Sequence, residues 1–401
     1  MNKRTLGVLL ACFCTVLAAY SIRYSYGTLL PEMLLSLSIT KAQAGVIYSS
    51  YFIAYTVFSP ILGIIADRFN LRYLIAGFVA LMGVGTFLMQ YPSSVWQASL
   101  FFTIAGIGCA ACWTPVMVLA LRWISNKRRG MSLAFIDAGS TLGVIVAGTI
   151  IPLVVDAANW HTGWLALGIM GLAVGAINLL FMRNYPLEKT AAAGIPSEKR
   201  SGAISLYKPV LVDKRFWLIG IAYMLTGFAI IIPFTFLSTY AVQEIGVNYG
   251  TATLLITFIG AGGLLGKLTL GPLSDKVGRI GILLVCALLI GGGCLAMVLC
   301  HGWILMAVCF IYGIGYGACW ALYAACASDI FSKQAAGGIV GLWTFLMGFG
   351  SILAPILAGW LADYTGTLMW AFLLAMAAGF ISFVLLLPML KVPRTSTVTQ
   401  N

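Results

Sequence analysis

Long apolar segments alternate with short charged or Pro/Gly/Asn-rich breaks along almost the whole chain. A helix of about 20 residues crosses the ~30 Å hydrocarbon layer of a membrane. Because the apolar runs are continuous rather than alternating, they predict helices and not barrel strands, and a helix satisfies its backbone polar groups within the segment. The pattern predicts twelve spanning helices, which begin near residues 6, 44, 72, 95, 130, 163, 216, 250, 280, 303, 337 and 367.

The two halves of the chain repeat each other. The segment Gly106–Trp113 (GIGCAACW) matches Gly313–Trp320 (GIGYGACW) at six of eight positions, at a separation of 207 residues. The charged segments that contain Asp67 and Asp275 also agree, at a separation of 208 residues. Such agreement predicts parallel six-helix repeats, and proteins built in this way bind their substrate between the repeats near the middle of the membrane.

The repeat also places the domain boundaries. We expect a first six-helix bundle at residues 1–183, a cytoplasmic linker at 184–215 and a second six-helix bundle at 216–401. The linker region is the one long polar stretch of the chain, and its composition is typical of a flexible connection. The predicted fold class is therefore an all-α membrane protein with twelve transmembrane helices in two parallel repeats.

Composition supports a membrane protein, because 61% of the residues are hydrophobic and only 8% are charged. The net charge of +12 could indicate nucleic-acid binding, so the positions of the charges have to decide. When the loops are assigned alternately to the two membrane sides, nearly all Lys and Arg residues fall on the side of the termini, as in cytoplasmic loops. We expect a multi-pass inner-membrane protein with both termini in the cytoplasm and no nucleic-acid partner.

Other kinds of site are not indicated. Most of the ten cysteines lie in apolar helices, where a thiol packs as a small hydrophobic group. No cluster of Cys, His and acidic residues has the spacing of a metal site. Gly262–Lys267 ends like a phosphate-binding loop but lacks its glycine spacing and its Ser/Thr. We expect no metal, no cofactor and no enzymatic activity.

Arg23, Asp137 and Lys267 are the only ionisable residues predicted well inside the spans. Each would cost about 3 kcal/mol or more if it faced lipid, so such residues face a cavity or a partner. Tyr20 shares a helix face with Arg23 and places a phenol beside the cation. We expect Arg23 to bind an anion in the cavity; the alternatives are snorkelling to the membrane surface and a structural ion pair.

Two charged segments share one pattern, Gly63–Arg72 after the second helix and Gly271–Arg279 as a turn after the eighth. The pattern resembles the signature loop of the major facilitator superfamily, and the resemblance covers the whole chain. It implies the major facilitator fold and transport by alternating access. Four motif residues would then brace the closed cytoplasmic face as gating residues: Asp67, Arg68, Asp275 and Arg279.

Two further segments, Trp123–Ala134 and Gly266–Gly271, resemble the monocarboxylate transporters and oxalate/formate antiporters. In that branch an arginine that binds the substrate carboxylate occupies the position of Lys267, and an aspartate involved in proton coupling occupies that of Gly263. Helices 4 and 10 line the cavity in this fold. Their aromatic residues are therefore candidates for substrate contact, with packing as the alternative: Trp113, Tyr316 and Trp320.

Helices 5 and 8 abut across the halves in the same fold, which brings Asp137 near Lys267. Both residues are predicted at similar depth, with Lys267 four to six residues before the end of its helix. We expect them to pair when the cytoplasmic side is shut, and an incoming anion or a proton on Asp137 to break the pair. In the competing interpretations Lys267 binds the substrate itself or extends to the lipid headgroups.

These features predict a secondary transporter that carries a small organic anion, preferably a monocarboxylate, by proton symport or anion exchange. Two cations against one acid in the spans favour an anionic substrate over a cationic drug. The alternatives are a multidrug or metabolite exporter of the same superfamily and a transporter-like receptor. The expected partners are the anion, protons or a counter-anion, and the lipid bilayer, and we expect a monomer.

Overall fold

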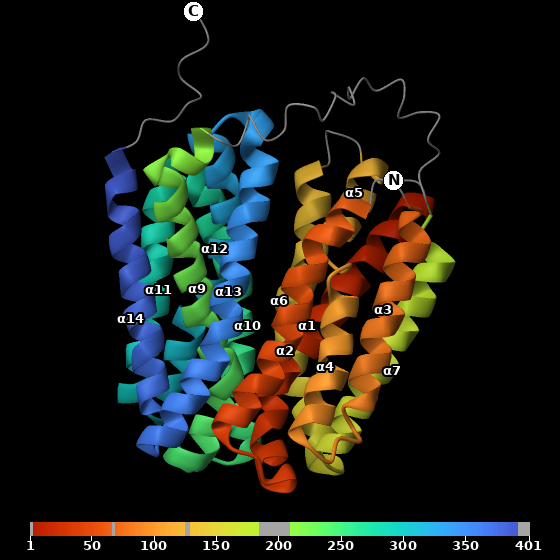
Figure 1. Cartoon of the computed structure of the whole chain (residues 1–401), viewed down its shortest axis with the longest axis vertical. Coiled ribbons are helices and arrows are strands. Elements are labelled where there is room, and N and C mark those ends of the chain that lie inside the picture. Colours follow the sequence, from red (N-terminus) through yellow and green to blue (C-terminus); the bar gives the residue numbers. More distant parts are fainter. Residues whose placement is uncertain (1–2, 66–68, 125–128, 184–208, 392–401) are drawn as a thin grey trace, which may run out of the picture.

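Two bundles of helices stand side by side in the computed structural model, which describes residues 3–65, 69–124, 129–183 and 209–391 (Figure 1). Within these ranges, 12 helical segments are long and apolar enough to span a membrane. They begin within about four residues of the predicted positions, as expected for helix ends. The prediction of an all-α membrane protein with twelve transmembrane helices is confirmed. The predicted linker, residues 184–215, lies mostly outside the described residues.

The fourth span consists of two short helices, so seven labelled helices make up the first bundle. They are α1 (Lys3–Leu37), α2 (Lys41–Ile65), α3 (Leu71–Leu88), α4 (Val95–Cys109), α5 (Thr114–Trp123), α6 (Arg129–Ala157) and α7 (Trp160–Phe181). The second bundle consists of α9 (Lys214–Tyr240) with η5 (Ala241–Ile245), α10 (Tyr249–Val277), α11 (Arg279–Leu299), α12 (Gly302–Ile330), α13 (Lys333–Thr365) and α14 (Met369–Leu386) with η6 (Leu387–Lys391). α1 begins and α14 ends at the same end of the molecule, which we call the terminal side (Figure 1).

The break between α4 and α5 is a difference between the two repeats. Pro115 lies in the first turn of α5, where its missing N–H costs nothing, whereas further inside a continuous helix it would remove a backbone hydrogen bond. At the separation of 207 residues its counterpart is Leu322, and α12 runs through that position without interruption. The fourth span is therefore interrupted between Cys109 and Thr114, with Pro115 at the start of its second helix.

The predicted turn at Gly271–Arg279 is also different. α10 continues to Val277, and the chain turns only at Gly278, whose φ of 113° favours glycine. Lys267 therefore lies ten residues before the end of α10 and not four to six. At ~1.5 Å per residue this places Lys267 about 15 Å from that end. Lys267 is thus deeper in the molecule than the sequence suggested.

The bundles meet closely at the end away from the terminal side, which we call the opposite side. A Cβ atom on Gly45 of α2 would overlap the carbonyl oxygen of Pro355 in α13, so only glycine allows this approach. At the start of α2, the amides of Lys41 and Ala42 donate to the two carboxylate oxygens of Asp363 in α13, at 3.0 and 2.8 Å. The opposite side is closed by backbone contact and by these hydrogen bonds.

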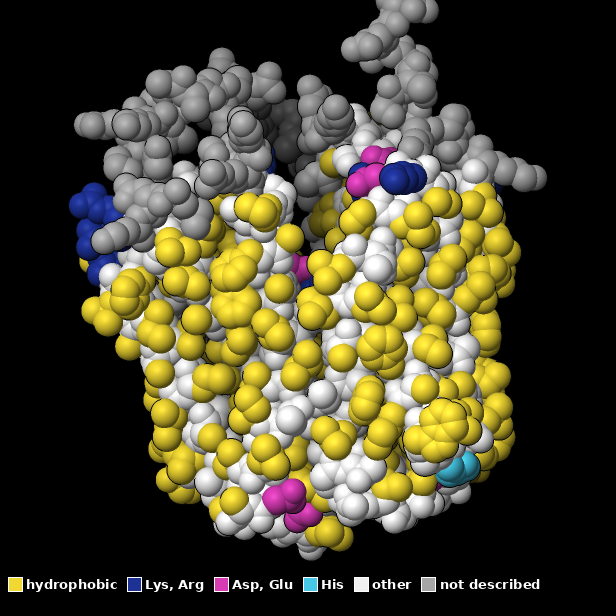
Figure 2. All heavy atoms as spheres, turned by 180° about the vertical axis from the view of Figure 1, so that it is seen from behind, with side chains coloured by type: hydrophobic (Ala, Val, Ile, Leu, Met, Phe, Trp, Pro, Cys, Tyr) yellow, Lys and Arg dark blue, Asp and Glu magenta, His cyan; other side chains and the backbone are white. Residues whose placement is uncertain are grey.

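Figure 2 shows hydrophobic side chains spread over the flanks of both bundles, with the charged side chains near the two ends. This distribution is that of a protein surrounded by lipid. Between the bundles, toward the terminal side, the same view shows a narrow gap with charged atoms inside it. The charged groups in this gap are visible from the flank of the molecule.

Candidate functional site

Arg23 lies inside the first bundle and is only 8% exposed. Four aromatic rings surround its guanidinium, with centroids 4.6 to 5.6 Å from Cζ. A cation near the face of an aromatic ring is attracted by about 0.5–2 kcal/mol, more when water is excluded. The rings offset part of the cost of burying the charge. We call this set of residues the aromatic cage: Tyr20, Tyr51, Phe52 and Tyr55.

The guanidinium of Arg23 donates to neutral groups of the first bundle. Nε donates to the Tyr51 hydroxyl at 3.4 Å, and one terminal nitrogen donates to the Cys109 sulfur at 3.5 Å. Among the described residues, no carboxylate lies within ion-pair distance of Arg23. A guanidinium has five N–H donors in a fork that fits a carboxylate or phosphate. Arg23 is therefore a buried cation that the described residues surround with neutral groups, which suits an anionic ligand.

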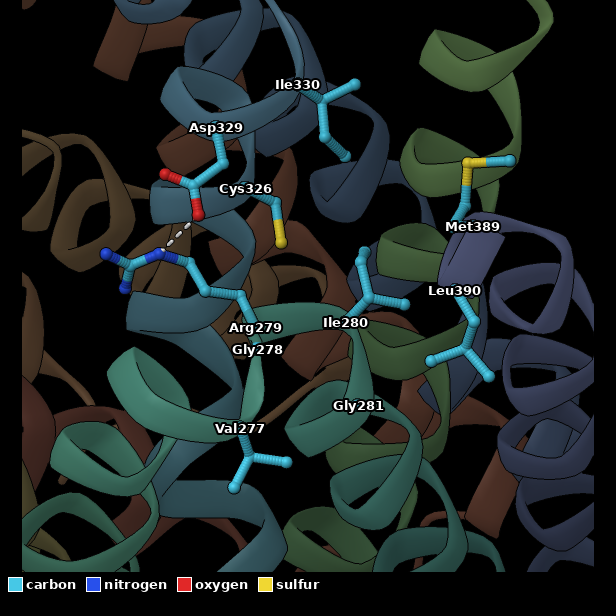
Figure 3. A pocket seen from close by; sticks show the side chains of 10 residues that line it. All are labelled: Val277, Gly278, Arg279, Ile280, Gly281, Cys326, Asp329, Ile330, Met389 and Leu390. Atoms are coloured by element: carbon cyan, nitrogen blue, oxygen red, sulfur yellow. Dashed lines mark hydrogen bonds and ion pairs between the residues drawn. The ribbon is translucent and has the colours of Figure 1, made fainter. Parts of the chain in front are cut away.

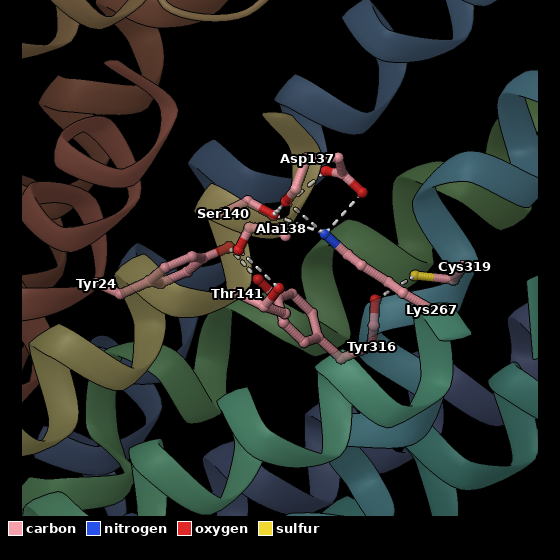
Figure 4. A network of polar contacts seen from close by, with 8 residues as sticks. All are labelled: Tyr24, Asp137, Ala138, Ser140, Thr141, Lys267, Tyr316 and Cys319. Carbon is pink, nitrogen blue, oxygen red and sulfur yellow. Dashed lines mark hydrogen bonds and ion pairs between the residues drawn. The ribbon is translucent and has the colours of Figure 1, made fainter. Parts of the chain in front are cut away.

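Lys267 of α10 and Asp137 of α6 form an ion pair between the two bundles (Figure 4). The distance from Lys267 Nζ to Asp137 Oδ2 is 2.9 Å. The same nitrogen donates to the Ser140 hydroxyl at 2.6 Å and to the Asp137 carbonyl at 3.2 Å. These three acceptors match the three donors of an ammonium group. Lys267 is fully paired in this conformation.

The pair lies where α6 and α10 touch. Gly263 packs against the Thr141 methyl group of α6, which brings the two helices close enough for Lys267 to reach Asp137. The side chains of Lys267 and Asp137 are 18% and 32% exposed, so water reaches both. The pair is present while the opposite side is closed. The conformational state in which it opens stays a prediction.

A series of aromatic contacts connects the aromatic cage to the second bundle. The Tyr20 ring lies 6.4 Å from Trp113 and 5.8 Å from Tyr24, measured between centroids. The Tyr316 hydroxyl of α12 donates to the Tyr24 hydroxyl at 3.4 Å, and the Tyr316 ring lies 6.3 Å from Trp320. Tyr316 is buried, whereas Tyr20, Trp113 and Trp320 are half-buried. The structure thus brings the predicted aromatic residues together around the cage.

The predicted gating residues lie apart from this region. Asp67 and Arg68 lie outside the described residues. Arg279 at the start of α11 contacts Asp275 at 3.2 Å and Asp329 of α12 at 2.8 Å. Figure 3 shows the Arg279–Asp329 contact beside a cavity of about 160 Å³ at the terminal side of the second bundle. These contacts hold together the ends of α10, α11 and α12.

Some members of the site were not predicted from the sequence. Phe52 and Cys109 contact Arg23 from α2 and α4, and Tyr24 connects the bundles. Phe52 and Cys109 lie in apolar runs, where core packing is the usual role of such side chains. Tyr24 directly follows Arg23 in the sequence, and this adjacency is the feature that could have identified Tyr24 as a member of the site. Tyr51 and Tyr55 lie one helical turn apart, so they share a helix face. The sequence alone does not indicate that this face contacts Arg23.

Comparison with known proteins identifies the family. The family model of the Major Facilitator Superfamily matches residues 11–266 and again residues 221–401. The membrane sensor protein UhpC of Salmonella typhimurium is 28% identical over 408 residues, covering 93% of this chain and 88% of that protein. The hexuronate transporter of Bacillus subtilis is 25% identical over 394 residues, covering 93% and 92%. Monocarboxylate transporter 12-B of Danio rerio is 23% identical over 354 residues, covering 79% and 72%.

A solved structure has the same fold. The crystal structure of the nucleoside transporter NupG aligns with a TM-score of 0.76 at 17% identity, covering 97% of this chain and 100% of that one. The matched fold is that of a transporter, and these relatives are named as transporters or, for UhpC, as a membrane sensor, and not as enzymes. With a family model that matches both halves and a fold of two helical bundles, the chain belongs to the Major Facilitator Superfamily.

Proposed function

We propose that this chain is a secondary active transporter of a small organic anion, preferably a monocarboxylate, that works by alternating access. The observation that carries the proposal is the buried Arg23 guanidinium, which has no carboxylate partner among the described residues. Relatives named for hexuronate and for monocarboxylates support an anionic substrate. Arg23 binds the carboxylate, and the half-buried Tyr20, Trp113 and Trp320 contact the rest of the solute, with Tyr316 behind them.

The basic loops support an inner-membrane orientation with the terminal side in the cytoplasm. In this orientation the described conformation is closed to the outside. The 1–183 and 216–401 bundles then rock about the site, and the 184–215 linker connects them. Arg279 and Asp275 brace the cytoplasmic ends of the helices.

Lys267 and Asp137 couple the site to transport. A substrate carboxylate that reaches Lys267 competes with Asp137 for the ammonium group, and a proton on Asp137 removes its charge. Either event weakens the contact between Asp137 and Lys267, which joins the bundles. A water-accessible ion pair contributes only about 0–1 kcal/mol to stability. The contribution of the ion pair to the closed conformation is therefore small enough for solute binding to offset. A carrier requires this, because it must open and close in each cycle. The coupling ion is a proton or a second anion.

Uptake into proteoliposomes tests the proposal at Arg23. Labelled monocarboxylates are supplied with and without an imposed pH gradient. Arg23→Gln should lower uptake by about 30-fold or more, since removing one partner of a buried charge pair costs about 2–5 kcal/mol. Arg23→Lys should retain part of the activity with a higher KM, because lysine keeps the charge but not the fork. Arg215→Gln is the control, since Arg215 pairs with Asp213 at a helix start. Wild-type uptake that Arg23→Gln leaves unchanged would refute the proposal.

Charge reversal tests the coupling pair. Asp137→Lys places two ammonium groups together and should abolish uptake. Adding Lys267→Asp restores opposite charges and should recover part of it. If the double variant is as inactive as the single one, the pair has no coupling role. If Lys267→Ala only raises KM for the anion, Lys267 is a substrate ligand instead.

A second candidate function is sensing, because one relative that spans most of the chain is named as a membrane sensor. A sensor would bind the anion at Arg23 but move none across the membrane. Binding measured on the purified protein without uptake in proteoliposomes would favour it. Efflux of cationic dyes from cells would instead favour the multidrug exporter.

A further inference from the structure

We infer that the transported anion carries one negative charge and has a flat apolar body, so that an aromatic monocarboxylate fits better than a sugar acid, a sugar phosphate or a dicarboxylate. This inference rests on the proposed function and deepens it. It is based on the net charge of the site, on the positions of the carboxamide side chains and on the aromatic surface near Arg23.

The charge of the site limits the charge of the ligand. Arg23 and Lys267 contribute two positive charges, and Asp137 contributes one negative charge that already contacts Lys267 at 2.9 Å. The sum is one positive charge, held by Arg23. A monoanion neutralises the site, whereas a dianion leaves an excess negative charge in a region where Arg23 is only 8% exposed. Because uncompensated buried charge is costly, the site selects monoanions.

The carboxamides, which commonly bind sugar hydroxyls, lie elsewhere. Among the described residues, Asn178 pairs with Thr15 inside the first bundle. The other asparagines cap helix starts: Asn70, Asn159 and Asn248. The glutamines whose side chains are described lie at helix ends or in η5: Gln43, Gln90, Gln97 and Gln243. Among the described residues, a ligand with several hydroxyl groups would meet tyrosine hydroxyls near Arg23 but no carboxamides, so fewer of its hydrogen bonds to water would be replaced.

Aromatic side chains contribute partly exposed surface near Arg23. Tyr20 and Tyr55 of the cage are half-buried, and so are Trp113 and Trp320. Tyr20 contacts Trp113 within the first bundle, and Trp320 belongs to the second. A flat ring whose carboxylate reaches Arg23 can stack on these faces, and offset stacking adds to the gain from burying the ring.

The experiment measures inhibition of uptake of one labelled monocarboxylate by unlabelled acids. Benzoate is compared with three probes: cyclohexanecarboxylate has the same carbon count but is not flat, phthalate adds a second charge, and glucuronate replaces the ring with a hydroxylated body. Each is tested on wild type, on Arg23→Lys, which keeps part of the uptake, and on Trp320→Leu. Benzoate should inhibit at least tenfold more strongly than phthalate or glucuronate and more strongly than cyclohexanecarboxylate. Trp320→Leu should reduce the advantage of benzoate over cyclohexanecarboxylate, because it removes one of the flat faces on which the ring stacks.

The outcomes separate the two proposals. Inhibition that requires Arg23 and is strongest for benzoate supports both. Inhibition that requires Arg23 but is equal or stronger for phthalate, glucuronate or cyclohexanecarboxylate overturns the aromatic monoanion and leaves an anion transporter. If no acid acts through Arg23, direct binding measured by thermal shift of the purified chain decides, and its absence overturns both.

Discussion

Asp363 of α13 is placed to hold the opposite side closed. Its two carboxylate oxygens accept from the first amides of α2, so a residue of the second bundle caps a helix of the first. These amides have no partner within their own helix, and the positive end of the helix dipole favours an anion there. Asp363 is exposed, which weakens the electrostatic part of the contact.

The magnitude follows from helix caps. Removing an N-cap side chain costs about 0.5–2 kcal/mol, and the charge adds about 0.3–1 kcal/mol when exposed. Asp363→Ala should therefore favour opening by about 1–2 kcal/mol, which corresponds to roughly 5- to 30-fold in the equilibrium between closed and open states. Asp363→Asn keeps one acceptor oxygen and should cost less, since asparagine caps helices nearly as well.

Hydrogen–deuterium exchange measures how strongly the amides of Lys41 and Ala42 are protected by this contact. In Asp363→Ala, peptides that contain Lys41 and Ala42 should exchange about tenfold faster than in wild type, with the interior of α7 unchanged. Asp156→Ala is a matched control. Asp156 lies 207 positions before Asp363. Its carboxylate is close to the start of α10, 3.8 Å from where a Cβ atom on Gly250 would lie. Among the described residues, however, Asp156 accepts no hydrogen bond from an amide of α10. Asp156→Ala should therefore change the exchange rate at the start of α10 only weakly. Unchanged exchange at α2 in a folded Asp363→Ala protein would refute the reasoning.

Further predictions concern the bundle interface and the charged pair. Gly27→Val should abolish uptake by a protein that still inserts, because its side chain would overlap the Phe234 carbonyl of α9; Gly77→Ala, which meets nothing within 4 Å, is the control. Asp137→Asn should make uptake insensitive to an imposed pH gradient if Asp137 carries the proton, and retained sensitivity would assign coupling elsewhere. Arg279→Gln removes contacts to Asp275 and Asp329 and should lower the thermal stability of the purified chain by about 1 kcal/mol or less, measured by the apparent Tm.

The spans were predictable because a helix satisfies its backbone polar groups within one apolar segment, so each span can be recognised locally in the sequence. The depth of Lys267 was not, because α10 continues through Gly271 and Pro272, two residues that normally end a helix. The cage around Arg23 was predictable only at Tyr20. Phe52 and Cys109 reach Arg23 from other helices, and which face of a helix meets which neighbour depends on packing over the whole bundle.

The duplication separates what the two halves share from what each does alone. Asp156 and Asp363 are related by 207 positions, and both lie near the start of a helix in the other bundle. At the same separation, the three charges of the spans have uncharged counterparts: Ile230 for Arg23, Thr344 for Asp137 and Pro60 for Lys267. Only Asp363 accepts hydrogen bonds from that helix start among the described residues, so the two related positions contribute unequally to closure. A ligand with one carboxylate is not symmetric, so its cation is needed once, and Arg23 without a partner in the second half suits such a solute.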